Sequence, residues 1–442
     1  MDKKFACGDE VKSKASGVFG RIIDDNGHAY KISVQSDSNK EVWLPHDEVV
    51  SASQASNEAA TLRVKSTQWE PIPRVAWGKA GDAMLNECIK ANKPLILTSQ
   101  EVVNWKTYEN LEGLGGLLGA KPMNVKLSPN GRFRYYDNTK NKGYPFKSPN
   151  FVQKMNWGDF LKVLNRNSGE EPAAGSREPT KAPRYYLQEC LSGHEEMADE
   201  FRTWDWQWLL KPVADHNWAT PKDVQLWVSS LGAESPLHFD EGENMYVQLR
   251  GRKRVVLYPP YDYLNVYPFP CGHPCDRHSM VNIVRYPIDE SLQKVFPRFA
   301  DATGHEALLQ PGELLYLPYG WWHYFRSEDN GAVSLNFWYI APDKNPYQDG
   351  KLCLTERLFV RIRRNLEGQV IGQMIEDGKK LPDIMPKLVS AFRSGSPCGE
   401  TKRYYDVMRE ILTSVQIPET EKDSFLLEML DGRFGLDWDL YV

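Results

Sequence analysis

The chain has 442 residues, of which 41% are hydrophobic and 12% aromatic, and its formal net charge is −5 with a pI near 6.1. This length exceeds what a single hydrophobic core usually serves, so we expect one large domain with smaller modules. No run of eighteen apolar residues is present, and a membrane-spanning protein is therefore not expected. The acidic balance gives no indication of nonspecific nucleic-acid binding.

The amino-terminal sequence and the cysteines indicate an intracellular protein. Residues 1–30 mix charged residues with glycines and contain no apolar signal-peptide core. The 7 cysteines are scattered and odd in number, unlike the disulfide framework of a small secreted domain, so we expect them to be reduced. We therefore expect a cytoplasmic or nuclear location.

Residues 1–55 are predicted to form a small β-barrel of the SH3-like type. Two β-rich runs, 17–23 and 29–34, flank Asp25-Asn26-Gly27, a sequence typical of a tight hairpin turn. A further run follows at 41–45, and the polar stretch 56–68 is predicted to be a linker. This module would bind a partner that the sequence does not define.

Residues 69–340 are predicted to form an α+β domain built on a β-barrel. A helix is expected over Gly81–Ala91 and an apolar strand over Pro94–Thr98, followed by many short strands separated by Gly and Pro. The segment Asn167–Pro183 is rich in Gly, Glu, Pro and Ser, which predicts a mobile surface loop.

Residues 341–442 are predicted to be helical. Apolar residues recur at steps of four and indicate an amphipathic helix whose stripe must be buried against something. The stripe consists of Leu354, Leu358, Ile362, Leu366, Val370 and Met374. Shorter helical patterns at 388–392, 404–412 and 425–430 are separated by Pro382, Pro386, Pro397 and Pro418.

Two separated motifs carry a candidate metal site. In Ser235-Pro-Leu-His238-Phe-Asp240 an imidazole and a carboxylate are two positions apart, and on a strand this spacing directs both to the same face. A second imidazole, His323, follows a glycine turn and an apolar strand 85 residues later. Two His and one carboxylate leave three octahedral positions open, as in non-haem Fe(II) oxygenases. A lone His-x-Asp is more often a surface pair, and Zn²⁺ would accept the same ligands although it more often uses His₃ or His₂Glu.

The sequence resembles the Jumonji-C, or cupin-like, family of oxygenases, and within it most closely the factor-inhibiting asparaginyl hydroxylase branch of the hypoxia response. The resemblance runs from Glu70 to about Gly395 and leaves out both ends of the chain. It rests on Pro311-Gly-Glu, Trp322-His323, Arg250-Gly-Arg-Lys253-Arg, Tyr258-Pro-Pro, Tyr267-Pro-Phe-Pro and His273-Pro-Cys-Asp-Arg277. It implies a double-stranded β-helix, or jelly-roll, with Fe(II) held by His238, Asp240 and His323.

The resemblance also implies 2-oxoglutarate as co-substrate and O₂ as oxidant. Lys253 would meet the distal carboxylate of 2-oxoglutarate, with hydroxyl groups from Tyr186 and Ser235, and Asn244 and Asn336 would lie beside the iron and the keto acid end. The family has threonine where this chain has Ser235, a change that keeps the donor. Without the metal motif, Lys253 would be read as part of a solvated charge run.

For the substrate, the resemblance implies Arg277, Tyr135, Trp338 and Gln188. The residue after Arg277, a glutamine in the family, is His278 here, and an imidazole offers fewer hydrogen bonds than a carboxamide. We therefore expect hydroxylation of Asn, or of Asp or His, in a partner protein, with release of succinate and CO₂. Ankyrin-repeat proteins are candidate partners, and the resemblance implies a homodimer formed by the C-terminal helices.

Three other interpretations stay open at this point. The same oxidant could remove methyl groups from lysine, or the chain could be a non-catalytic metal-binding scaffold. The run Cys271-Gly-His273-Pro-Cys275-Asp-Arg-His278 could be a structural zinc site, although it lacks a CxxC pair. Trp322 is interpreted as a packing residue.

Overall fold

The computed structural model describes two compact units, residues 1–68 and 69–442. Its described residues are 10–13, 19–25, 29–34, 41–45, 49–51, 69–118, 121–140, 148–166, 183–221, 223–342, 347–348, 351–352, 356–397, 399–434 and 438–441. Within these ranges no helix is long and apolar enough to cross a membrane. Of the predicted loop Asn167–Pro183, all but Pro183 lies outside the described residues, as does the predicted linker 56–68.

The first unit contains one antiparallel sheet of five strands in the order β4-β3-β2-β1-β5. The strands are β1 (Glu10–Ser13), β2 (Phe19–Asp25), β3 (Ala29–Val34), β4 (Glu41–Pro45) and β5 (Val49–Ser51). The pairing of β2 with β3 is the hairpin expected around Asn26-Gly27, whose turn lies outside the described residues. Closure of this sheet into an SH3-like barrel stays a prediction.

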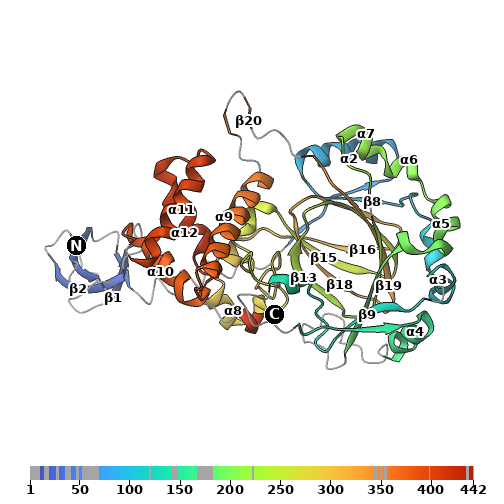
Figure 1. Ribbon diagram of the computed structural model, residues 1–442, viewed down its shortest axis with the longest axis horizontal. Coiled ribbons are helices and arrows are strands. Elements are labelled where there is room, and N and C mark those ends of the chain that lie inside the picture. Colours follow the sequence, from blue (N-terminus) through green and yellow to red (C-terminus); the bar gives the residue numbers. More distant parts are fainter. Residues whose placement is uncertain are drawn as a thin grey trace. The chain divides into compact units, whose positions relative to one another are not determined.

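The core of the second unit is a jelly-roll of eight strands shared between two sheets (Figure 1). One sheet contains the run β12-β19-β14-β17 and the other the run β13-β18-β15-β16, and every pair within these runs is antiparallel. The strands are β12 (Val224–Ser229), β13 (Glu234–Phe239), β14 (Glu243–Arg250), β15 (Lys253–Tyr258), β16 (His305–Leu309), β17 (Leu314–Leu317), β18 (Trp322–Ser327) and β19 (Ala332–Tyr339). The predicted α+β jelly-roll core is therefore confirmed.

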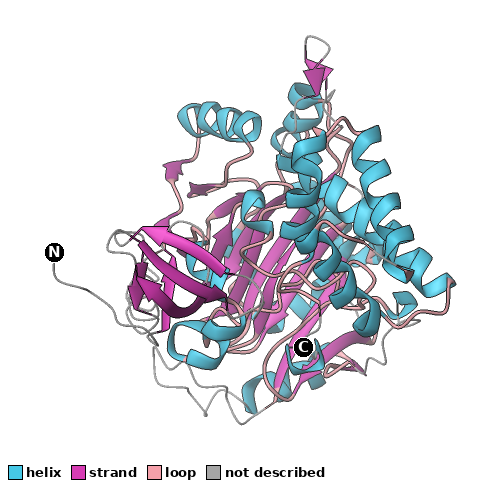
Figure 2. Cartoon of the chain, turned by 90° about the vertical axis from the view of Figure 1, so that its left-hand side faces the viewer, coloured by secondary structure: helices cyan, strands magenta, loops and turns pink. Residues whose placement is uncertain are grey.

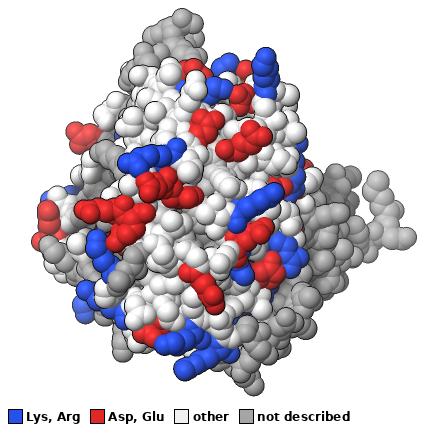
Figure 3. Space-filling model, turned by 90° about the vertical axis from the view of Figure 1, so that its right-hand side faces the viewer, with Lys and Arg blue, Asp and Glu red and all other residues white. Residues whose placement is uncertain are grey.

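The larger sheet extends beyond the jelly-roll at both edges and is covered by helices. Strands β11 (Arg184–Cys190), β9 (Met123–Ser128) and β10 (Phe151–Met155) extend one edge, and β8 (Leu95–Thr98) and β7 (Arg74–Ala76) the other, while β6 (Glu70–Pro71) pairs with β16. The helices are α2 (Lys79–Ala91), α3 (Leu111–Leu118), α4 (Trp157–Arg166), α5 (Ala198–Thr203), α6 (Trp206–Leu209) and α7 (Lys211–His216). The predicted helix 81–91 and strand 94–98 are confirmed as α2 and β8. On the face that carries α3 and α5, Figure 3 shows both signs of charge interspersed over the described surface.

Four helices lie on the outer side of the smaller sheet, one of them against the segment Pro260–Tyr263 that follows β15 and the others packed outside it (Figure 2). They are α9 (Glu356–Glu376), α10 (Leu381–Ser394), α11 (Glu400–Ser414) and α12 (Lys422–Leu430). Pro386, expected to separate two helices, lies inside α10, where it cannot donate a helical backbone hydrogen bond, so the expected break is not found.

The apolar stripe of α9 is buried within the chain itself. Ile362, Leu366, Val370 and Met374 belong to one apolar cluster with Tyr258 of β15 and Trp322 of β18, and Leu366 is 0% exposed. The stripe is therefore not a free face for self-association, and homodimerisation stays a prediction that needs a different surface. Trp322, also 0% exposed, is the packing residue that was expected.

Candidate metal centre and its cavity

The two candidate imidazole ligands lie opposite each other on neighbouring strands. His238 of β13 pairs in register with His323 of β18, and their ring centroids are 4.1 Å apart. Asp240 follows β13 directly, and its Oδ2 is 3.6 Å from Nε2 of His323. One ligand atom from each of the three residues lies within 4.8 Å of the other two. The structure thus brings together three side chains from two distant segments.

The backbone fixes the orientation of both imidazoles. Nδ1 of His238 donates to the carbonyl oxygen of Pro236 at 2.8 Å, and Nδ1 of His323 donates to that of Trp321 at 3.0 Å. Each ring therefore turns Nε2, with its lone pair, towards the site, an arrangement common among metal-bound histidines.

The protonation states also suit a metal ion. Burial lowers the pKa of both His238 and His323, so both rings are neutral. Burial alone would raise the pKa of Asp240, but its electrostatic interactions with the two imidazoles and the Arg277 guanidinium, together with a hydrogen bond from Trp338, lower this pKa. Two neutral imidazoles and one carboxylate are the deprotonated donors that a divalent cation requires, so the residues fit such an ion.

A cavity of about 330 Å³ opens onto the three donors. All the predicted co-substrate and substrate residues except Lys253 line it, namely Tyr135, Tyr186, Gln188, Ser235, Asn244, Arg277, His278, Asn336 and Trp338. Side chains from both sheets contribute, which places the cavity inside the barrel. The buried amide oxygens of Asn244 and Asn336 have no hydrogen-bond partner in the described chain, so they are available to a ligand.

Lys253 is buried beside the cavity, next to the lining residues Tyr186 and Tyr246. Its side chain is 2% exposed, its Nζ donates to Ser334 Oγ at 3.0 Å, and this atom is 5.5 Å from the ring centroid of Tyr186. Within the described part of the chain no carboxylate forms an ion pair with it, and burial lowers its pKa to about 7. A buried ammonium without a counter-charge is unfavourable alone and favours an anionic ligand.

Lys253 is not part of a solvated charge run, whereas its neighbour Arg252 does meet water. Arg252 has a side chain 46% exposed and pairs with Asp329 at 2.8 Å. Within β15 the side chains alternate between the two faces, so Lys253 turns inward while the next residue, Arg254, is partly exposed and pairs with Glu306.

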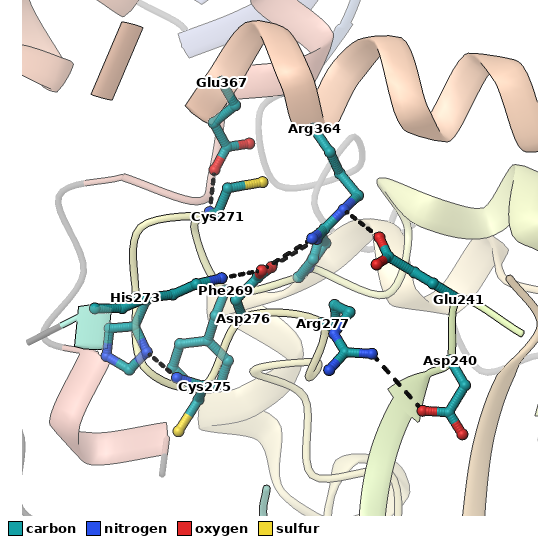
Figure 4. A network of polar contacts seen from close by, with 12 residues as sticks. Asp240, Glu241, Phe269, Cys271, His273, Cys275, Asp276, Arg277, Arg364 and Glu367 are labelled. Carbon is teal, nitrogen blue, oxygen red and sulfur yellow. Dashed lines mark hydrogen bonds and ion pairs between the residues drawn. The ribbon is translucent and has the colours of Figure 1, made fainter. Parts of the chain in front are cut away.

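The loop that carries Arg277 and His278 is held by helix α9 (Figure 4). Arg364 of α9 forms two hydrogen bonds with the carboxylate of Asp276, at 2.6 and 2.9 Å, and lies 3.3 Å from Glu241. Lys140 also donates to Asp276, at 2.6 Å. A buried carboxylate with two cationic partners is a firm anchor for the residues that follow it.

This anchor sets the next two residues against the metal centre. Arg277 has a backbone φ of +67°, unusual for a residue with a side chain, and its carbonyl accepts from the Phe239 N–H at 3.1 Å. Its guanidinium is 3.8 Å from Asp240 and lies over the ring of Tyr135. Only the fold shows that Arg277 meets Asp240 and that the ring centroid of His278 lies 5.0 Å from that of His238.

The alternative zinc site in this loop is not formed. His273 Nδ1 accepts from the backbone N–H of Cys275, while His278 lies in the cavity. Among the described residues, the one group of three or more His, Cys, Asp or Glu side chains close enough to hold a metal is His238, Asp240 and His323.

Seven residues of the cavity wall were not predicted as site residues. They are Lys126, Phe133, Trp227, Phe239, Tyr246, Asp276 and Phe325. Phe239 and Asp276 belong to the motifs Ser235–Asp240 and His273–Arg277, and these motifs are the sequence signal for both residues. Lys126 stands on β9 in no motif, and only its pairing opposite Tyr186 of β11 brings it to the site.

The chain matches the cupin-like domain family over residues 82–345, more than half of its length. It belongs to this family. HSPB1-associated protein 1 of Homo sapiens is 40% identical over 118 residues, 26% of this chain and 23% of that protein. Lysine-specific demethylase 8 of Xenopus tropicalis is 34% identical over 116 residues, 26% of this chain and 25% of that protein. tRNA wybutosine-synthesizing protein 5 of Danio rerio is 24% identical over 265 residues, 56% of this chain and 71% of that protein.

The cupin-like chain thus spans about a quarter of the first two relatives, so their names do not carry over to it as a whole. The predicted family is confirmed, whereas the asparaginyl hydroxylase branch within it stays a prediction.

Proposed function

We propose that this cupin-like chain is an Fe(II)- and 2-oxoglutarate-dependent oxygenase that hydroxylates a side chain of a protein or peptide. The proposal rests on two features that occur in the same barrel. Three deprotonated donors converge at the cavity, and a buried ammonium without a carboxylate partner in the described chain lies beside two residues that line it. A metal and an anionic co-substrate would satisfy both features at once.

In this proposal His238, Asp240 and His323 hold the metal on one face. Bound Fe(II) and 2-oxoglutarate supply the activation of dioxygen and the oxidation of a C–H bond. Lys253 binds the distal carboxylate, and the hydrogen-bonded hydroxyls of Tyr186 and Ser235 complete its contacts.

The remaining wall orients the substrate and excludes water. Asn244 and Asn336 present their amide oxygens beside the metal donors, while Arg277, His278, Gln188 and Trp338 position the target residue. Tyr135, 54% exposed, stands at the edge of the cavity where a peptide would enter.

His278 sets the choice of target. Its pKa is lowered by burial first and by His238 next, so the ring is neutral and offers one donor and one acceptor. Asn, Asp and His are the target side chains that we propose, and ankyrin-repeat proteins are the first candidates for partners.

Lysine demethylation is the second candidate function. It is favoured by one observation, the 34% identity to the protein named lysine-specific demethylase 8. Release of formaldehyde from methylated peptides separates it from stable hydroxylation. A non-catalytic scaffold has no feature in its favour, because each proposed metal and co-substrate position carries a competent residue.

The first test is an anaerobic titration of the iron-loaded chain with 2-oxoglutarate. A weak visible charge-transfer band is expected on chelation, followed by succinate when oxygen and substrate are added. Mass spectrometry of ankyrin-repeat and whole-lysate proteins treated with the enzyme should then reveal additions of one oxygen. Absence of both the band and succinate would refute the oxygenase proposal.

A further inference from the structure

Lys126 brings a second lysine to the cavity, from outside the jelly-roll. It lies on β9 directly opposite Tyr186 of β11, and residues paired in register point to the same face of a sheet. Tyr186, and Gln188 two positions further along, both line the cavity. The inner face of the larger sheet therefore continues past the barrel, and Lys126 stands on this continuation.

The contacts of Lys126 are with neutral groups. Its Nζ donates to Gln188 Oε1 at 2.9 Å, and Gln188 Nε2 donates in turn to Gln225 Oε1 at 3.5 Å. No carboxylate forms an ion pair with Lys126 within the described ranges, and burial lowers its pKa. The ammonium has two further N–H groups, because one hydrogen bond uses only one of its three donors.

The carboxylates of the cavity wall are already engaged. Only Asp240 and Asp276 line the cavity among the described residues. Asp240 belongs to the metal donors, and Asp276 is neutralised by Arg364 and Lys140. A half-buried cation that faces a cavity without a free carboxylate attracts an anion from outside the chain.

We propose that Lys126, oriented by Gln188, forms a subsite for a side-chain carboxylate of the substrate, so that the enzyme prefers acidic peptides. The acidic residue is either the oxidised one or a neighbour within reach of β9. This assignment rests on the proposed function for what is oxidised, but the binding of the carboxylate does not depend on it. The two lysines are separate sites, because Lys253 is assigned to the co-substrate from β15 within the jelly-roll, whereas Lys126 lines the cavity from β9 outside it.

The test compares two nearly isosteric probes, N-acetyl-aspartate N-methylamide and N-acetyl-asparagine N-methylamide. Calorimetric titrations use the full chain saturated with Mn(II) and 2-oxoglutarate without oxygen, which closes the Lys253 site to the probes. Wild type is compared with Lys126→Gln and Lys126→Arg. Lys154→Gln is the matched control, because Lys154 is exposed on the neighbouring strand β10. N-acetyl-alanine, whose only carboxylate is terminal, is the third probe.

Wild type should bind the aspartate probe about three- to tenfold more tightly than the asparagine probe, between the effects of exposed and buried charge pairs. This preference should vanish in Lys126→Gln and persist in Lys126→Arg and Lys154→Gln. Equal binding of the two probes by wild type, or an intact preference in Lys126→Gln, would overturn the subsite. If the Gln variant does not fold, loss of the preference in Lys126→Arg overturns it instead. Preferred binding of N-acetyl-alanine would overturn the side-chain assignment in favour of a chain terminus.

Failure of the proposed function gives a different result. If neither Mn(II) nor 2-oxoglutarate binds, the oxygenase assignment fails. The same probes are then titrated into metal-free Lys253→Ala protein with and without Lys126→Gln, which tests the carboxylate subsite alone.

Discussion

The interior of the barrel has an apolar side and a polar side. Strands β15, β16 and β17 supply apolar residues that pack together with Ile72 and Ile96, among them Val255, Leu257, Ala307, Leu309, Leu315 and Leu317. Strands β11, β13, β14 and β19 supply polar residues of the cavity, and Lys253, the first residue of β15, adds a buried ammonium beside them. The two sides meet at Tyr246 and Phe325, whose stacked ring centroids are 4.7 Å apart and which belong to both groups.

The difference shows how one barrel divides stability from function. Apolar contacts need no partner of defined geometry, so the apolar side stabilises the fold in any ligand state. The polar side contains a buried ammonium and open amide oxygens, which are unfavourable until a ligand meets them. Changes on the apolar side should therefore alter stability, and changes on the polar side should alter binding.

The largest effect is expected at the metal donors. His238→Ala and His323→Ala should each abolish metal binding and succinate formation, because two donors hold a divalent ion loosely. Each variant should stay folded, since it removes one of two facing buried imidazoles. Metal content and succinate release measure the effect, with His216→Ala on α7 as the control. Succinate formation at the wild-type rate in either variant would refute the ligand assignment.

On the apolar side, Leu315→Ala should reduce the free energy of unfolding by about 2–5 kcal/mol, as expected when a buried leucine leaves a cavity. The affinity for metal should remain unchanged. Leu308→Ala, 38% exposed on β16, is the matched control and should have little effect on stability. Chemical denaturation measures the free energy of unfolding, and metal titration measures the affinity for metal. A weakened metal affinity in folded Leu315→Ala would break the division between the two sides.

Lys253→Ala should raise the dissociation constant of 2-oxoglutarate by about tenfold to a hundredfold, the contribution of a charge-assisted hydrogen bond of about 1.5–3 kcal/mol. Metal affinity should be nearly intact. Arg252→Ala, which removes the exposed neighbouring cation, should leave the dissociation constant unchanged. An unchanged constant in Lys253→Ala would assign the role to another residue.

The smallest effect is a pH dependence. Burial lowers the pKa of Lys253 to about 7 in the ligand-free chain, and the protonated form is the one that binds an anion. Affinity for 2-oxoglutarate should therefore be constant below pH 7 and fall as the pH rises above it, approaching about tenfold per pH unit. In Lys253→Ala the affinity for 2-oxoglutarate should not change with pH over this range. A wild-type affinity that rises with pH would contradict the assignment.

The metal donors could be predicted because their signal is local. The spacing of His238 and Asp240 follows from strand alternation, and a glycine turn and an apolar strand lead into His323. The stripe on α9 was equally visible, but periodicity shows only that a face is buried and not what covers it. Here the apolar cluster that contains the stripe is completed by residues of the same chain, among them residues of α10, α11, β15 and β18, rather than by a second copy.

The place of Lys126 could not be predicted. It depends on the pairing of β9 with β11. The segment between these two strands contains β10, α4 and residues outside the described ranges. A shift of one residue in that pairing would turn Lys126 away from the cavity. The anchoring of Asp276 by Arg364 likewise depends on the packing of α9, because these residues lie far apart in sequence.

The facing positions of His238 and His323 have a mechanical consequence. The ladder between β13 and β18 is interrupted by a register shift between Ser235 and His238, so this strand pair is weakest beside the metal donors. An ion held by both imidazoles would clamp the two strands together across that interruption. At a metal concentration a hundredfold above its dissociation constant, such a clamp adds about 2.7 kcal/mol to the folded state. Removal of the metal with a chelator should therefore accelerate amide hydrogen exchange in β13 and β18 more than in the rest of the barrel.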